Sequence, residues 1–591
     1  MASYGIQYSV DQPAVRKQLE KILAHRLFVR SGRMGRFLRL AIERTLAGKA
    51  GDLKEYLIGV EVFDRRADYD PRVDPIVRVE ARRLRSKLRA YYECDGGADP
   101  VVIEFIAGSY APRIHFRGAN GFAFRPAPSP VPVTLALLPF VNLSPSPANE
   151  YFSDGLTEEL IHALTKLPGM RVAAWNSASQ LRHRQEDIAT IRRELSVATV
   201  LTGSLRLSGS SLRVRAQLID TASGVYLWSE TYDRQVGDVF EIQEEIAQSI
   251  VRTLSGRLAG GPETGIALRH RGTIQSYDYY LKGRHSLHNR RPDGLARSIA
   301  HFTAAVEADP ESAIAYAGLA DGYSLLVDHG LLHPAEGMPK AKAAASKALQ
   351  LDPNLAEAYT SLAMVRSLYD HEWEEAEVLY QKAIALNPGY ATAHQWLGCD
   401  LYAVLGRFAE ARTEIEIARQ LDPLSSIIRE SCAFILMFER RYDEALQTCR
   451  ELAEFDPSFH RTYTSMGRIY ALQGRYPEAL EMLEKGRGLA GNMPSILAAM
   501  AQVHALAGER KRAGQLRLEL SELAKTRYVP LASFAIVHLG LGEHEKALEY
   551  LEAACEQRDL RANVLKAHPL YDPLRAYPRF QAILHRLKFP L

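Results

Sequence analysis

Hydrophobic residues in the first part of the chain recur at the three- and four-residue steps of an amphipathic helix. The pattern predicts helices over about 11–25 and 32–47, and the apolar segment 53–63 could form a third. It is strongest over 74–92, where an apolar stripe and an arginine stripe are rotated by about 100° from each other. The apolar stripe consists of Val77, Ala81, Leu84, Leu88 and Tyr91. The basic stripe consists of Arg78, Arg82, Arg85 and Arg89. We therefore expect one face of this helix to pack inward while its neighbour carries guanidinium groups outward.

A β-hairpin is predicted directly after the basic helix. The turn sequence DGGADP separates the helix from VVIEFIAGSYAPRI, in which two strand-like runs flank a bend near Gly108. Residues 117–132 follow, with prolines at four alternate positions that favour a stiff, extended linker. We therefore place the first domain at 1–117 and a Pro-rich linker at 118–132.

The middle of the chain, 133–256, alternates strand and helix patterns and predicts an α/β (α+β) domain. The predicted strands are 134–140, 171–174, 200–209, 212–220 and 225–233. The predicted helices are 154–167, 187–195 and 238–256. Asp154 is placed as the cap of the first helix, with Glu158 and Glu159 in its first turn, where the helix dipole favours acids. These acids, together with Asp220, fit caps and surface charge better than acid–base catalysts.

Internal repetition begins after a linker at 257–273. The repeated prolines are Pro353, Pro388, Pro423 and Pro457, spaced by 35, 35 and 34 residues. A period near 34 residues, with small residues where two helices cross and proline closing the second helix, is the tetratricopeptide (TPR) pattern. Residues 274–591 are therefore predicted to form an all-α solenoid whose groove holds a protein or peptide. The aromatic residues expected in its core are Trp373, Trp396 and Tyr402. We expect 568–587 to cover the open end of the last repeat.

Charge is unevenly distributed along the chain. The 591 residues include 73 Lys and Arg against 70 Asp and Glu, a net charge of only +3. Residues 1–117 hold 22 of the basic residues against 15 acidic ones, which leaves 51 basic against 55 acidic residues in the remainder. Because a local basic excess attracts anionic partners, the first domain is the place to expect one. A chain of this length needs about three or four domains.

Motifs for catalysis, cofactors and metals are missing from the sequence. The five cysteines have no CxxC spacing and indicate a reducing compartment: Cys94, Cys399, Cys432, Cys449 and Cys555. We find no P-loop, GxGxxG or GxSxG, and HEWEE at 371–375 lacks the second histidine of HExxH. No apolar run approaches the roughly 18 residues of a membrane helix. We therefore expect a cytoplasmic, non-enzymatic protein with no catalytic site, cofactor, metal or membrane contact.

Two segments resemble known families. The sequence VRVEARRLRSKL followed by IEFIAGSY resembles the effector domains of OmpR/PhoB-type response regulators. The matching positions are Val77, Val79, Arg83, Leu84, Arg85, Lys87 and Leu88 in the helix and Gly108 and Tyr110 in the wing. This resemblance implies a winged helix-turn-helix domain with the basic helix as its recognition helix. LALLPFVNLS, EYFSDGLTEEL, TGSLRLSGSSLRVRAQLID and LWSETYD are similar to the TolB-like domain, which often accompanies TPR repeats in bacterial regulators.

The expected architecture is therefore an N-terminal winged helix, a central α/β TolB-like domain and a C-terminal all-α TPR solenoid. The expected function is a DNA-binding transcriptional regulator whose repeats recruit or sense protein partners. The residues expected to contact double-stranded DNA are Arg78, Arg82, Arg83, Arg85, Lys87 and Arg89. The alternative is an interaction scaffold whose basic N-terminal domain docks an acidic protein. The sequence leaves the target, the inducing signal and the oligomeric state open, with a homo-oligomer among the options.

Overall fold

The chain divides into two compact units, Met1–Ser129 and Pro130–Leu591, which we call the N-terminal and C-terminal units. The computed structural model describes residues 12–29, 31–47, 53–66, 69, 76–96, 99–105, 110–116, 133–167, 169–182, 187–254, 272–288 and 292–589. Each unit is described by itself below.

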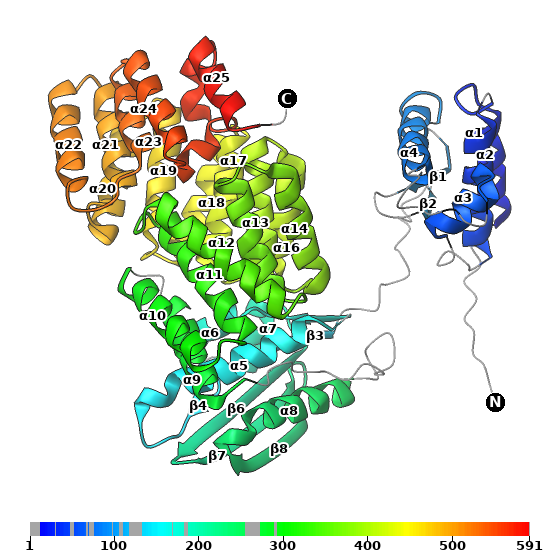
Figure 1. Cartoon of the computed structure of the whole chain (residues 1–591), viewed down its shortest axis with the longest axis horizontal. Coiled ribbons are helices and arrows are strands. Elements are labelled where there is room, and N and C mark those ends of the chain that lie inside the picture. Colours follow the sequence, from blue (N-terminus) through cyan, green and yellow to red (C-terminus); the bar gives the residue numbers. More distant parts are fainter. Residues whose placement is uncertain are drawn as a thin grey trace. The chain divides into compact units, whose positions relative to one another are not determined.

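The described part of the N-terminal unit consists of helices followed by an antiparallel pair of strands (Figure 1). Its elements are α1 (Gln12–Ala24), α2 (Gly32–Leu46), α3 (Glu55–Phe63), α4 (Ile76–Cys94), β1 (Val101–Phe105) and β2 (Pro112–Phe116). The strand register pairs Val101 with Phe116 and Phe105 with Pro112. The predicted helices and the pairing of the two strands are confirmed, whereas the predicted bend at Gly108 lies outside the described residues.

The apolar stripe of α4 lies in the core of the N-terminal unit. Its five side chains, Val77, Ala81, Leu84, Leu88 and Tyr91, are at most 2% exposed. In the same core, the Phe37 ring of α2 lies edge-on to Phe63 and Phe105, at centroid distances of 6.0 and 6.1 Å. The prediction that this face packs inward is therefore confirmed, and it fixes which side of α4 remains for solvent.

Asp99 joins α1 to α4 just before the strand pair. Its buried carboxylate accepts hydrogen bonds from Gln18 Nε2 at 2.6 Å and Tyr91 Oη at 2.5 Å, and from Lys21 Nζ. Burial alone would raise the pKa of Asp99, but these three donors outweigh it and lower that pKa below its usual value. The stabilisation by the ionised carboxylate is therefore complete above its usual pKa, and it is lost as the pH falls through the lowered value.

Replacing Asp99 by alanine should loosen the N-terminal unit. The change leaves the Tyr91 hydroxyl and the Gln18 amide buried without their partner, which costs about 1–3 kcal/mol. In the full chain, amide hydrogen exchange of α1 and α4 should accelerate by about 5- to 150-fold. Lys17→Ala, at an exposed residue of α1, is the control. Unchanged exchange in Asp99→Ala would contradict the assigned role of this carboxylate.

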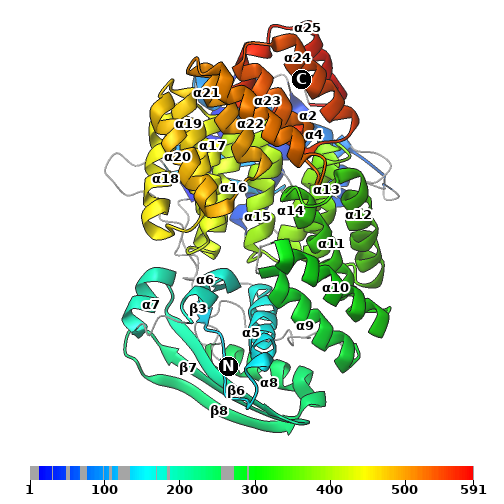
Figure 2. The ribbon, with the colours of Figure 1, turned by 90° about the vertical axis from the view of Figure 1, so that its left-hand side faces the viewer.

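The C-terminal unit begins with a mixed sheet in the order β5-β3-β6-β7-β8, with β4 paired to β6 (Figure 2). The strands are β3 (Val133–Leu137), β4 (Val141–Asn142), β5 (Met170–Val172), β6 (Thr199–Ser208), β7 (Ser211–Asp220) and β8 (Tyr226–Gln235). The helices are α5 (Glu150–Thr165), α6 (Trp175–Gln180), α7 (Ile188–Leu195) and α8 (Val239–Leu254). Strand β3 is parallel to β5 and β6, whereas β6, β7 and β8 are antiparallel neighbours. The five predicted strands are confirmed; α6 and the short β4 were not predicted.

Helix α5 begins at Glu150 rather than at Asp154, so the predicted cap is wrong. A 3-10 turn at Pro147–Asn149 leads directly into the helix, and Asn149 takes the N-cap position. Asp154 consequently lies one turn inside the helix, where its buried carboxylate pairs with Arg182 and with His285 Nδ1 at 3.1 Å. The helix begins four residues earlier than predicted because the 3-10 turn at Pro147–Asn149 already leads into it.

The rest of the C-terminal unit is an array of antiparallel helix pairs, which we call the repeat array (Figure 1). Its first half contains α9 (Ile274–His288), α10 (Pro292–Ala308), α11 (Ala313–Asp328), α12 (Pro334–Leu351), α13 (Ala356–Leu368), α14 (Trp373–Leu386), α15 (Ala391–Trp396), the π-helical segment η5 (Leu397–Ala403) and α16 (Phe408–Leu421). Its second half contains α17 (Ser426–Phe438), α18 (Tyr442–Phe455), α19 (His460–Leu472), α20 (Tyr476–Ala490), α21 (Pro494–Leu506), α22 (Arg510–Leu523), α23 (Leu531–Gly540), α24 (His544–Glu556), the 3-10 helices η6 (Leu560–Val564) and η7 (Pro569–Leu574), and α25 (Pro578–Arg586).

Small residues allow the paired helices to approach closely, as the repeat pattern predicted. A Cβ atom on Gly467 of α19 would lie 2.6 Å from Leu483 Cγ and 3.0 Å from the Ala479 carbonyl oxygen of α20. Any larger side chain there would push the pair apart. The aromatic residues predicted in the core, Trp373, Trp396 and Tyr402, are all buried.

The C-terminal segment 558–589 folds back across the repeat array. It contacts α24, where Arg579 Nη2 pairs with Glu552 at 2.7 Å. It also reaches much earlier repeats, and these contacts are Trp373 Nε1 to the Leu587 carbonyl at 2.9 Å, Asn563 Nδ2 to the Leu368 carbonyl at 2.7 Å and Arg561 Nη2 to the Asp328 carbonyl at 2.9 Å. The segment predicted to cover the last repeat thus also binds the first half of the array.

Candidate functional site

The exposed face of α4 presents two arginines held by glutamates. Arg78 is 54% exposed, and its Nε donates to Glu55 Oε1 of α3 at 2.7 Å. Arg83 is 67% exposed, and its Nη1 donates to Glu80 Oε1 at 2.6 Å, one turn earlier in the same helix. Both guanidinium groups therefore lie at the surface, each oriented by a carboxylate.

The other predicted contacts of α4 differ from these. Lys87 turns toward the α1–α2 connection, where Nζ donates to the Leu27 carbonyl at 2.7 Å and to Ser31 Oγ at 2.5 Å. Its ammonium group also lies 5.9 Å from the centre of the Phe28 ring. Lys87 thus helps to hold α4 in place. Arg85 is partly buried, and the side chains of Arg82 and Arg89 lie outside the described residues.

Glu55 links α3, α4 and the residues before β2. Besides Arg78, it accepts a hydrogen bond from the hydroxyl of Tyr110, the residue matched to the predicted wing. Burial first, and then this bond to Glu55, raise the pKa of Tyr110 to about 12, so its hydroxyl stays protonated at neutral pH. Sequence reasoning missed Glu55, because no spacing rule connects it to residues 23 and 55 positions further along the chain.

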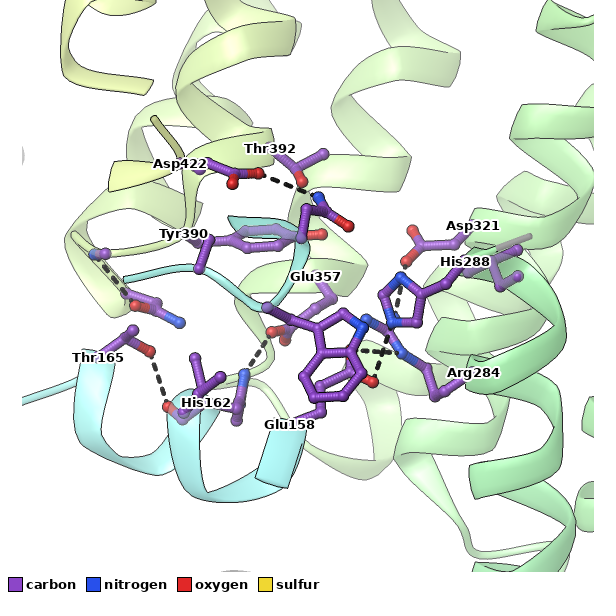
Figure 3. A pocket seen from close by; sticks show the side chains of 18 of the residues that line it. Glu158, His162, Thr165, Arg284, His288, Asp321, Glu357, Tyr390, Thr392 and Asp422 are labelled. Atoms are coloured by element: carbon purple, nitrogen blue, oxygen red, sulfur yellow. Dashed lines mark hydrogen bonds and ion pairs between the residues drawn. The ribbon is translucent and has the colours of Figure 1, made fainter. Parts of the chain in front are cut away.

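A second charged site lies inside the C-terminal unit, between α5 of the sheet domain (133–254) and the start of the repeat array (Figure 3). A cavity of about 130 Å³ is lined from α5 by Glu158 and His162. The residues facing them from the repeat array include Arg284, His288, Asp321 and Glu357. The sheet domain and the array therefore meet through ionisable groups.

These groups are paired across the junction. Glu158 accepts from Arg284 Nε at 3.0 Å and lies 3.0 Å from His288 Nε2, while His162 Nδ1 lies 2.8 Å from Glu357 Oε1 (Figure 3). Burial would raise the pKa of both glutamates, but the facing charges outweigh it. Arg284 and His288 hold the pKa of Glu158 far below its usual value, and His162 lowers the pKa of Glu357 to about 2.

The junction continues on the side of α6. Ser177 Oγ donates to Asp422 Oδ1 at the end of α16, and Asn176 Nδ2 donates to Asp422 Oδ2 at 3.0 Å. The backbone amide of Ala174 donates to the Leu421 carbonyl at 3.0 Å. Because carboxylates, histidines and arginine bind one another here, the arrangement works as a latch between the sheet domain and the array.

The interpretation of Glu158 as surface charge is therefore wrong. Its side chain is only 13% exposed, because α9 covers this face of α5. The partners Arg284 and His288 follow 126 and 130 residues later, beyond the predicted linker. The residues that shield Glu158 belong to the repeat array, so the sequence of the sheet domain alone does not reveal them.

Glu158→Gln should weaken this latch. The change removes the ion pair between Glu158 and Arg284, and Arg284 is largely buried. Breaking a buried ion pair in this way costs on the order of 3 kcal/mol. We expect faster amide hydrogen exchange in α5 and α9 of the full chain, with little change in α19 or α20.

Glu241→Gln, in the exposed first turn of α8, is the matched control for that prediction. Equal exchange in Glu158→Gln and the control would contradict the latch.

Acid should weaken the junction in the same way as the substitution does. The lowered pKa values of Glu158 and Glu357 mean that the pairing stabilises the junction above about pH 4.5 and is lost as the pH falls toward 2.

Neither a metal-binding cluster nor a membrane-spanning helix occurs in the part of the chain that the structure describes. No group of three or more His, Cys, Asp or Glu side chains there could hold a metal ion. No helix there is long and apolar enough to cross a membrane.

Parts of the chain are similar to known protein families and to individual proteins. Residues 132–249 match the family model of the HilA/YgeH-like transcriptional regulator, second domain, and residues 367–433 and 460–485 match tetratricopeptide repeat models. The chain is 34% identical over 232 residues to a protein named putative adenylate cyclase 3 of Rhizobium meliloti strain 1021, covering 39% of this chain and 38% of that one. It is 24% identical over 332 residues to the transcriptional regulator HilA of Salmonella typhimurium, covering 55% and 58%.

The chain thus spans between 38% and 58% of the length of these relatives. Among solved structures, a tetratricopeptide repeat protein from Parabacteroides merdae is 16% identical and covers 46% of this chain and all of its own, with a TM-score of 0.34. The chain is therefore similar to HilA-like transcriptional regulators. It combines an N-terminal helical region, a central mixed α/β sheet domain and a helical TPR array.

Proposed function

We propose that this protein is a DNA-binding transcriptional regulator and that its N-terminal unit is a winged helix-turn-helix. In this proposal α4 is the recognition helix, α3 is the helix before it, and β1 and β2 form the wing. The observation that carries the proposal is the division of α4 into a buried apolar face and a face with Arg78 and Arg83 at the surface. The similarity to HilA supports the same role.

The geometry suggests how such a helix would bind. An α-helix fits the major groove, where a guanidinium fork can pair with guanine or with a phosphate. Glu55 fixes the direction of Arg78, and a fixed side chain loses less entropy on binding. Lys87 holds α4 against the α1–α2 connection, so we assign it to positioning the helix rather than to the DNA surface.

We further propose that the sheet domain is TolB-like and that the repeat array recruits or senses a protein partner. The latch around Glu158 and Arg284 supports a coupled arrangement, because it joins the sheet domain to the first repeats. Through this junction, a partner bound to the array would then also affect the position of the sheet domain.

The DNA-binding proposal predicts a salt-dependent affinity that Arg83→Ala reduces. With a fluorescent duplex of random sequence, the affinity of the full chain should fall steeply with added salt, because phosphate contacts release counterions. Arg83→Ala should lower that affinity by about 10-fold and reduce the slope of log K against log salt by about one.

The control for Arg83→Ala is Arg16→Ala, an exposed arginine of α1 that also pairs with a glutamate, Glu43. It should bind DNA as the wild-type protein does. Binding that responds neither to salt nor to Arg83→Ala would sink the regulator proposal. If instead an acidic polypeptide bound and DNA did not, the basic unit would be a protein-docking module.

A further inference from the structure

A second cavity lies inside the repeat array, closed by the C-terminal segment. It measures about 190 Å³ and is lined by inner helices of the array, among them α17, α19 and α23, and by η6 and η7. The contacts of Arg561 with the Asp328 carbonyl and of Asn563 with the Leu368 carbonyl hold η6 over it. The chain thus fills part of its own groove and leaves a partly open cavity beside the segment.

One cation in this cavity lacks a counterpart. Among the residues that the structure describes, the guanidinium group of Arg468 makes no hydrogen bond or ion pair. Its neighbours differ: Arg461 pairs with Glu430 at 3.4 Å, and Arg561 donates to the Asp328 carbonyl. Burial first, and then repulsion by Arg561, lower the pKa of Arg468 to about 10, so it remains charged at neutral pH. Arg468 is partly buried, and a charge partly withdrawn from water without an ion-pair partner is costly, which indicates that it has another use.

A carboxyl group of the same cavity is also without a partner. Asp400 lies in η5, the π-helical interruption between α15 and α16, and makes no hydrogen bond or ion pair within the described chain. Burial is the main cause that raises its pKa to about 8, so at neutral pH it is mostly a neutral acid that can donate a proton in a hydrogen bond. π-Helical turns of this kind are rare and occur often at functional sites.

The remaining lining sets the size and charge of what could fit. Three arginines face two carboxylates, Asp328 and Glu430, while Asp400 is neutral and burial lowers the pKa of His568 to about 3. This balance favours a single negative charge. Apolar side chains complete the wall, including Leu368, Val404, Phe434 and Ile536. A cavity of roughly 150 Å³ can hold a benzene molecule, so this one has room for an apolar body of at least that size.

We propose that this cavity binds a small organic carboxylate of one negative charge. Its carboxylate pairs with Arg468 and accepts from Asp400, and its apolar body lies against Phe434 and Ile536. Because η6 and η7 form one wall, the bound ligand also ties the C-terminal segment to the inner helices. The site is separate from α4, so this inference stands or falls independently of DNA binding.

The test uses the full chain with three probe acids, benzoate, phenylacetate and 3-methylbutanoate, and their uncharged amides. At least one acid should bind by calorimetry and raise the melting temperature, while its amide should not. Arg468→Met keeps most of the side-chain volume and removes the charge. It should weaken binding of that acid by at least about 10-fold, the equivalent of a lost charge-assisted contact.

Two measurements separate loss of binding from loss of folding. Without ligand, Arg468→Met should melt at or above the temperature of the wild-type protein, because it removes a partly buried charge that has no ion-pair partner. Arg468→Lys, which retains the charge, should keep part of the affinity. Arg450→Met, at an exposed arginine of α18, should bind as the wild-type protein does. Failure of all three acids to bind, equal binding of the amides, or unchanged binding by Arg468→Met would each overturn the proposal.

Discussion

A repeat array has two open apolar ends, and covering them is the constraint on which the C-terminal unit depends. At the first end, α5 of the sheet domain packs on α9 so closely that a Cβ atom on Gly155 would lie 2.4 Å from Leu281 Cδ2. The apolar core consequently runs without a break from the sheet domain into the array. At the other end, segment 558–589 lies on α24 and then reaches back to the first half of the array. Among the described residues, the sheet domain thus packs on the first end and the C-terminal segment on the other.

Charged side chains serve different purposes in the two units. In the C-terminal unit most of the ionic groups described above bind one another, as Glu158 does with Arg284 and His288. In the N-terminal unit, Glu55 of α3 and Glu80 of α4 lie beside two arginines of α4 that remain more than half exposed. A shielded pair contributes chiefly to the junction that it spans, whereas an exposed guanidinium lies where a further molecule can reach it. Two of the basic residues of the first 117 positions, Arg78 and Arg83, are thus exposed on α4.

Local periodicity explains what could be predicted from the sequence. The stripe from Val77 to Tyr91 and the proline spacing of the repeats report which face of a helix is buried and where a helix ends, and both predictions agree with the structure. The misplaced start of α5 and the burial of Glu158 depend on tertiary contacts that no short window contains. The same holds for Lys87, whose hydrogen bonds reach residues 56 and 60 positions earlier. The π-helical turn at Leu397–Ala403 has no sequence signature of its own.

The return of the C-terminal segment to α13 and α14 changes the mechanical character of the array. In an open superhelix each repeat contacts only its neighbours, so small rotations between repeats add up along the axis and change its length. Here Leu587 binds Trp373 and Arg561 binds the Asp328 carbonyl, so the chain of contacts closes on itself. A rotation between two repeats inside this closed set of contacts requires the C-terminal segment or other repeats to move as well. The array should therefore move more nearly as one body than an open solenoid would, as long as the C-terminal segment keeps these contacts.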